Sequence, residues 1–91
     1  MSQWVYIVTN QHNMTLYVGI TNDPIQCLEQ HKLGAVFPYG PDKMVFLEER
    51  QDQIAAIERE KQLNRMSRLE KEVLINQQNP NWLSIPLLPV H

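Results

Sequence analysis

The sequence has few of the residues that define secreted, fibrous or membrane-bound proteins. Its 91 residues include one cysteine, Cys27, so no disulfide can form within the chain, as is usual in a reducing compartment. No apolar run approaches the ~20 residues that a membrane-spanning helix needs, and the N-terminus lacks the features of a secretory signal. Hydrophobic residues make up 43% and charged residues 20%, as in a globular domain. We therefore expect a cytoplasmic protein without membrane contact.

Positive charge is scarce in the first third of the chain. The formal net charge is −2, and the first Lys or Arg is Lys32. This balance argues against tight binding of nucleic acid, because that affinity comes mostly from cations that neutralise phosphates. Five of the eight basic residues fall between positions 59 and 71, where they alternate with glutamates. The stretch is either a solvated helix surface or part of a weak DNA-binding surface to which Lys32, Arg65 and Arg68 contribute.

Hydrophobic patterns predict three strands. Residues 4–8 and 15–20 are rich in β-branched and aromatic side chains, and the polar residues 10–13 between them predict a hairpin turn. A third, apolar strand is expected at residues 44–47, either central in the sheet or well covered. Residues 37–42 before it are rich in Pro and Gly and predict a loop.

Capping residues predict three helices. Asp23 caps the first, which begins at Pro24 and ends at Gly34. The second is expected to begin at residue 51 or 52 and to end near residue 66. A capping box of Ser and Glu at positions 67 and 70 begins the third, which ends before the Asn-Pro pair at positions 79 and 80.

The order of these elements, β-β-α-β-α-α, predicts an α+β fold. Its sheet has three antiparallel strands, and the helices pack on it. We expect a single domain over residues 1–83, followed by an extended C-terminal tail at 84–91. Because the tail is apolar, it either covers the core or docks a partner chain, which includes the possibility of a homodimer.

Two tyrosines on adjacent predicted strands, with a glycine two residues after the second, form the central motifs of the sequence. The motifs are Val5-Tyr6-Ile7 and Tyr17-Val18-Gly19, and His31 follows on the first helix. Further motifs follow in order at residues 39–45 (Tyr-Gly-Pro-Asp-Lys-Met-Val), 59–63 (Arg-Glu-Lys-Gln-Leu) and 79–82 (Asn-Pro-Asn-Trp). In these motifs the chain resembles the small stand-alone branch of the GIY-YIG nuclease superfamily, over roughly residues 4–83.

The resemblance implies an endonuclease that hydrolyses DNA phosphodiester bonds with one divalent ion, Mg²⁺ or Mn²⁺. Tyr6 or Tyr17 would activate or orient the attacking water, and Glu60 would hold the ion. The resemblance also makes His31 a catalytic residue and Gly19 a structural part of the motif. Side chains alternate along a strand, so Tyr6 and Tyr17 share a face if the register places them opposite each other.

Glu60 is also unusual without the resemblance. On the second helix it shares an apolar stripe with Ile57 and Leu63, where a carboxylate is costly unless it is paired, hydrogen-bonded or metal-bound. The alternative is a glutamate at the edge of the stripe that turns to water or pairs with Lys61 or Arg65. The resemblance favours the metal ligand.

The chain departs from the family at one position of the first helix. The family carries an arginine four residues before the histidine, and here that residue is Cys27, next to the uncharged Gln26. Comparable arginines in phosphoryl transfer contribute roughly 10³ to 10⁵ in rate. We therefore expect a degenerate active site with weak or no cleavage, unless Lys32, Arg50 or Arg59 supplies the charge. The alternative is an inactive module that retains the fold to bind nucleic acid or protein.

Cys27 has two further interpretations. It lies four residues before His31 on one helix face, a spacing that also suits half of a metal site or a catalytic Cys-His pair. Two ligands are too few for a metal site, however, and a lone helical cysteine is most often a small core hydrophobe. We favour the core interpretation.

Overall fold

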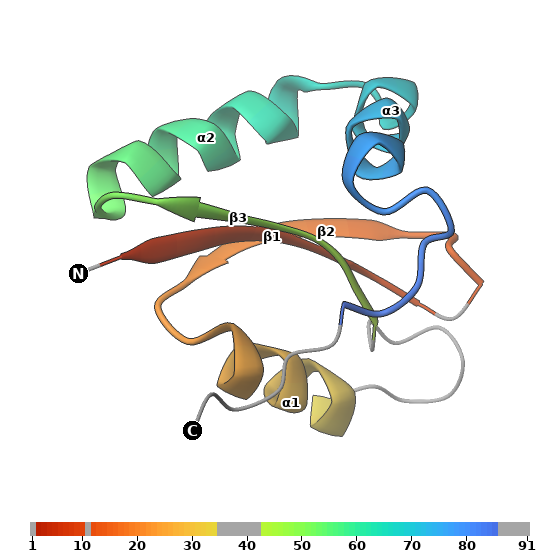
Figure 1. Cartoon of the computed structure of the whole chain (residues 1–91), viewed down its shortest axis with the longest axis horizontal. Helices are drawn as coiled ribbons and strands as arrows, with labels where there is room; N and C mark the ends of the chain where they lie inside the picture. Colours follow the sequence, from red (N-terminus) through yellow and green to blue (C-terminus); the bar gives the residue numbers. More distant parts are fainter. Residues whose placement is uncertain (1, 11, 35–42, 86–91) are drawn as a thin grey trace.

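A single antiparallel sheet separates the helices of this protein into two groups. The computed structural model describes residues 2–10, 12–34 and 43–85, without the side chains of residues 31–34. Helix α1 covers one face of the sheet, and α2 and α3 cover the other (Figure 1). The predicted loop at 37–42 and residues 86–91 of the predicted tail lie outside the described residues.

The described residues form strands and helices in the predicted order β-β-α-β-α-α, which confirms the α+β fold. The elements are β1 (Gln3–Thr9), β2 (Leu16–Thr21), α1 (Pro24–Gly34), β3 (Lys43–Arg50), α2 (Gln53–Arg65) and α3 (Arg68–Gln78). None of these helices is both long enough and apolar enough to cross a membrane. The cytoplasmic location stays a prediction.

The helices begin at the capping residues that the sequence supplies. The Asp23 carboxylate accepts a hydrogen bond from Gln26 N at 3.1 Å, and Asp52 accepts one from Ala55 N at 2.9 Å. Ser67 and Glu70 form the predicted capping box at the start of α3. Each cap satisfies an amide that has no partner within the helix, so the boundaries are fixed locally.

The sheet is antiparallel with strand order β2-β1-β3, so β1 is the central strand. Its residues from Val5 to Thr9 are all buried. The possibility that the strand predicted at 44–47 is central is therefore wrong, because β3 pairs on one side only. The other possibility, that it is well covered, describes β3, whose residues 44–46 are buried.

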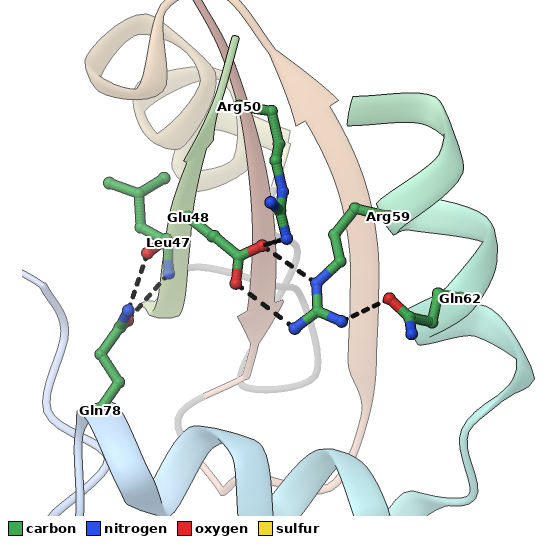
Figure 2. A network of polar contacts seen from close by, with 6 residues as sticks. All are labelled: Leu47, Glu48, Arg50, Arg59, Gln62 and Gln78. Carbon is green, nitrogen blue, oxygen red and sulfur yellow. Dashed lines mark hydrogen bonds and ion pairs between the residues drawn. The ribbon is translucent and has the colours of Figure 1, made fainter. Parts of the chain in front are cut away.

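The outer edge of β3 is closed by the end of α3 and the segment after it. The Gln78 side chain accepts a hydrogen bond from Leu47 N at 3.0 Å and donates one to Leu47 O at 2.8 Å (Figure 2). Asn79 Nδ2 donates to Val45 O at 3.1 Å, and Ile85 N donates to Met44 O at 2.8 Å. These groups satisfy edge-strand donors and acceptors that would otherwise be free to pair with another chain.

The alternation of side chains along β1 divides the core into two clusters. Val5 and Ile7 face α2 and α3, where they belong to a cluster with Ala56, Leu63 and Ile75. Tyr6 and Val8 face the other way, toward α1, and their cluster contains Leu28 and Met44. A change of one residue in the register would exchange the two faces, so this burial pattern fixes how β1 sits between the helices.

We predict that Gln78→Ala destabilises the fold by about 1–2 kcal/mol, because two hydrogen bonds to Leu47 are lost. Gln77→Ala is the matched control, because Gln77 is an exposed neighbour with no hydrogen bond among the described residues. Urea denaturation of both variants measures the difference. Equal stabilities would contradict the role of Gln78 at the edge of β3.

Candidate active site

The two motif tyrosines lie on the same face of the hairpin, but not opposite each other. Tyr6 of β1 is paired with Gly19 of β2, and Tyr17 is paired with Val8. Residues paired across antiparallel strands share a face, so Tyr6 and Tyr17 are diagonal neighbours on the face that α1 covers. Tyr6 is only 8% exposed, whereas Tyr17 is 49% exposed.

The Tyr6 ring lies against the backbone of Gly19. A Cβ atom at position 19 would lie 2.6 Å from Tyr6 Cζ and 3.0 Å from Cε2, and closer still to the hydroxyl oxygen. No described glycine has a positive φ, so position 19 needs glycine for space and not for backbone conformation. Because β2 is an edge strand, the Tyr6 hydroxyl is held at the edge of the sheet.

The hydroxyl of Tyr6 is hydrogen-bonded to the side chain of Cys27 on α1. Burial raises the pKa of Tyr6 well above its usual value of about 10, and the contact with the Cys27 side chain raises it further. The carboxylate of Glu60 adds a smaller upward contribution to the same pKa. Tyr6 is therefore a phenol that keeps its proton at neutral pH.

Cys27 is held beside Tyr6 by the start of α1. The backbone N–H of Cys27 donates to Asp23 O at 3.0 Å, within the first turn. Its half-buried side chain packs on the cluster that contains Tyr6 and Leu28. This agrees with the interpretation of Cys27 as a small core residue, and it puts position 27 next to Tyr6.

Glu60 lies on α2, which contacts β2 and β1 from the opposite face of the sheet. As expected from the sequence, it shares a stripe with the buried Leu63 and the half-buried Ile57. Within the described part of the chain, no hydrogen bond or ion pair engages its carboxylate, so the alternative pairing with Lys61 or Arg65 is not formed. A half-buried, unpaired carboxylate has the chemistry of a ligand for a cation.

Arg50 and Arg59 do not take the place of the missing arginine. Both pair with Glu48 of β3, and Arg59 Nε donates to Glu48 Oε1 at 3.0 Å (Figure 2). Arg59 also donates to Gln62 at 2.5 Å. Glu48 is paired with Val5 in the sheet register, so this network lies on the face of α2 and not on the face of Tyr6 and Cys27.

The remaining predicted site residues are dispersed. His31 and Lys32 lie in the last part of α1, and their side chains are outside the described residues. Arg65 is exposed at the end of α2. Arg68 donates to Met14 O at 2.8 Å and to Asn13 O at 2.5 Å, which ties α3 to the hairpin turn. The DNA-binding roles of these cations stay predictions.

Glu60, whose charge acts on Tyr6 although α2 lies on the other face of the sheet, is the side chain that could hold a divalent ion. No three His, Cys, Asp or Glu side chains gather into a metal-binding group in the described ranges. Mg²⁺ nevertheless tends to keep several waters and to bind through one or two carboxylates together with substrate phosphates. The unpaired Glu60 carboxylate fits that mode.

Comparison with known protein families identifies the family of this chain. The model of the GIY-YIG catalytic domain matches residues 2–73, which include Tyr6, Tyr17, Cys27 and Glu60. The chain belongs to the GIY-YIG family. Of its motif residues, Tyr6 and Gly19 are paired across β1 and β2, and Tyr17 lies diagonally from Tyr6.

A solved structure supports the fold of this GIY-YIG chain. The solution NMR structure of the UPF0213 protein BH0048 from Bacillus halodurans is similar with a TM-score of 0.60 and 24% sequence identity, over 90% of each chain. At that identity the likeness is evidence for the fold alone. Among curated proteins, none matches the sequence.

Sequence reasoning missed the partners of Tyr6. It expected Tyr6 and Tyr17 to share a face if the strand register placed them opposite each other. It did not predict that Tyr6 contacts Gly19 or Cys27. The signal for Gly19 was present, because a glycine inside a strand often marks a close approach of another group. The contact with Cys27 had no local signal, because it joins Tyr6 to a helix that begins 18 residues after Tyr6.

We predict that Gly19→Ala destabilises the fold by about 1–3 kcal/mol, because the new methyl group overlaps the buried Tyr6 ring. Gly19→Ala combined with Tyr6→Leu should recover part of the loss, since the hydroxyl and the distal ring atoms are removed. Thermal or urea denaturation measures the coupling between the two sites. Strict additivity of the two losses would contradict the contact.

We also predict that Tyr6 makes the stability fall at alkaline pH. In the unfolded chain Tyr6 loses its proton near pH ~10, whereas the folded chain retains it. Above that pH the folded state binds more protons than the unfolded state, so the free energy of unfolding falls as pH rises. Urea denaturation from pH ~9 to ~11 should show this slope in the wild type and a smaller slope in Tyr6→Phe. Tyr17→Phe is the control, because it retains Tyr6 and should keep the part of the slope that Tyr6 causes. An unchanged slope in Tyr6→Phe would contradict the assignment of this pH dependence to Tyr6.

Proposed function

We propose that this GIY-YIG chain is an endonuclease domain that hydrolyses DNA phosphodiester bonds with one Mg²⁺ or Mn²⁺ ion, and that its activity is low. The observation that carries the proposal is the meeting of Tyr6 with Cys27 at the edge of the sheet, within the field of the Glu60 carboxylate. Tyrosine and carboxylate are the groups that the nuclease chemistry needs. The cation that should accompany them is replaced by a thiol.

Each side chain has a distinct part in this proposal. The protonated Tyr6 hydroxyl orients the attacking water or the phosphate through a hydrogen bond. Tyr17, which is about half exposed, is accessible to the strand being cut. Glu60 would hold the divalent ion, which when bound stabilises the charge on the leaving oxygen. His31, on the same helix as Cys27, is a further candidate for proton transfer.

The substitution at position 27 weakens this machinery in two ways. An arginine would stabilise the charge that develops on the phosphoryl oxygens, and a neutral thiol does not. An arginine beside Tyr6 would also favour the phenolate and lower the pKa of Tyr6, whereas Cys27 raises it. The first effect reduces the rate directly, and the second disfavours a phenolate base, so that Tyr6 is left with its hydrogen-bonding role. Arg50 and Arg59 are committed to Glu48 on the other face.

The same observation supports a second candidate function. A GIY-YIG fold with a protonated tyrosine and no adjacent arginine can serve as a module that binds nucleic acid or protein without cutting. The net charge of −2 then favours a weak interaction with DNA, or an interaction with a protein or a second copy of the chain. Salt-sensitive DNA binding without cleavage distinguishes the nucleic-acid version.

We predict that Cys27→Arg increases Mg²⁺- or Mn²⁺-dependent cleavage by about 10³-fold or more, the contribution of comparable arginines. The assay uses single-stranded, duplex and branched DNA with the wild type and Cys27→Arg. Glu60→Ala should abolish cleavage in both backgrounds, because the ligand of the ion is lost.

Glu58→Ala is the matched control, since Glu58 is an exposed carboxylate two residues earlier on α2. It should leave cleavage unchanged in both backgrounds. If neither the wild type nor Cys27→Arg cuts any of the three DNA forms, the nuclease proposal fails and the binding module becomes the better account. Equal losses in Glu58→Ala and Glu60→Ala would remove the support for Glu60 as a ligand.

A further inference from the structure

A pocket lies between α3, the β1–β2 turn and residues 80–82, which follow α3. Residues 80–82 lie beyond the part of the chain that the GIY-YIG model matches, whereas Arg68 and Glu72 lie within it. The volume of the pocket is about 360 Å³, within the range of sites for small organic groups. Its charged, amide and aromatic lining residues include Arg68, Glu72, Asn76, Asn81 and Trp82.

We propose that this pocket binds one unpaired base of a nucleic acid strand, stacked on the indole of Trp82. The proposal rests on the proposed function only in taking nucleic acid as the ligand, and it requires no cleavage. Sequence-tolerant binding of single strands commonly depends on aromatic side chains on which bases stack. Trp82 lines the pocket and packs in part against the core cluster of α2 and α3, at a site remote from Tyr6.

The turn holds Trp82 in one orientation. Its backbone has φ 53°, a left-handed conformation that is unfavourable for a bulky residue. Trp82 N donates to Asn79 O at 3.0 Å, and the Asn79 side chain accepts from Leu83 N and donates to Leu83 O. The indole N–H donates to Asn76 Oδ1 at 2.6 Å. A stacking surface fixed in this way loses little entropy when a base binds.

The polar groups around the indole suit a neutral, flat ligand with hydrogen-bonding edges. Asn76 and Asn81 are exposed, and side-chain amides both donate to and accept from base edges. The charge of Arg68 is balanced by Glu72, whose carboxylate accepts from Arg68 Nε at 2.7 Å. A pocket with balanced charge favours a base over an isolated phosphate.

The edge strand connects this pocket with the candidate active site. Asn13 lines the pocket, and Gly19, which lies under Tyr6, is six residues further along β2 and its turn. At ~3.3 Å per residue of extended chain the two ends are separated by at most about 20 Å. A single strand that follows this edge would pass the half-exposed Tyr17 between them. The pocket would thus hold a base several nucleotides away from the bond at Tyr6.

The test measures binding of fluorescein-labelled dA10 and dT10 and of an abasic 10-mer with the same number of phosphates. EDTA is present, so binding is measured without cleavage. We expect the wild type to prefer the base-containing strands. Trp82→Ala should lower affinity for dA10 by about 5- to 150-fold, as for other stacked bases, and leave the abasic strand unaffected.

Further variants keep the test valid if Trp82→Ala does not fold. Trp82→Phe retains a stacking surface and should retain most of the preference for bases. Asn81→Ala, at an exposed side chain with no described hydrogen bond, should reduce affinity for dA10, whereas its matched control Asn64→Ala on α2 should not. In Trp4→Phe the sole tryptophan is Trp82, whose fluorescence should be quenched by dA10 and not by the abasic strand.

Equal wild-type affinity for dA10 and the abasic strand would overturn the proposal, as would unchanged dA10 affinity in a folded Trp82→Ala variant. Base-dependent binding that requires Trp82 in a chain that does not cut DNA would support the pocket and refute the nuclease function. Cleavage of DNA by a chain that shows no preference for base-containing strands would support the nuclease function and refute the base-binding pocket. The two proposals can therefore fail separately.

Discussion

The contact between the Tyr6 ring and Gly19 is the constraint on which the candidate active site depends. The ring of a central-strand tyrosine can cross to the edge strand only where that strand has no side chain. Its hydroxyl then reaches the sheet edge, next to α1, while the ring remains buried among apolar residues. Burial, the neighbouring thiol and the Glu60 carboxylate all act on this one hydroxyl.

The positions of α2 and α3 depend on polar contacts with β3. Glu48 binds Arg50 of its own strand and Arg59 of α2, so it fixes α2 against β3 one residue before Glu60 (Figure 2). Gln78 and Asn79 close the edge of the same strand, which places the turn that carries Trp82. Arg68 fastens the other end of α3 to the hairpin turn. Helix α3, which lines the pocket, is thus held at both of its ends.

Position 27 shows how one substitution changes a site without disturbing the fold around it. A thiol fits the half-buried space on α1 and bonds to Tyr6. The same space occupied by a guanidinium would carry a permanent charge beside the phenol and the phosphate. Cys27 therefore contributes to packing, and under the proposed function its lack of a permanent charge is the reason to expect low activity.

Much of the fold could be predicted from local sequence signals. Asp23, Asp52 and Ser67 define where the helices begin, because a cap acts within three residues of itself. The β-branched and aromatic residues of the hairpin predicted its strands, and the motifs around Tyr6 and Tyr17 indicated the family that the family model confirms. The departure at Cys27 was equally visible, since it needs only a position on one helix.

What the sequence by itself determined were the properties that short-range geometry fixes: the strands, the helix starts, the family motifs and an uncharged residue at position 27. The tertiary structure alone decided that β3 is an edge strand, that Tyr6 lies opposite Gly19 and touches Cys27, and that Arg59 turns to Glu48. It also decided that residues 79–82 form a pocket with α3. These contacts join residues far apart in the chain, and their partners are selected by the packing of whole elements, which no local pattern records.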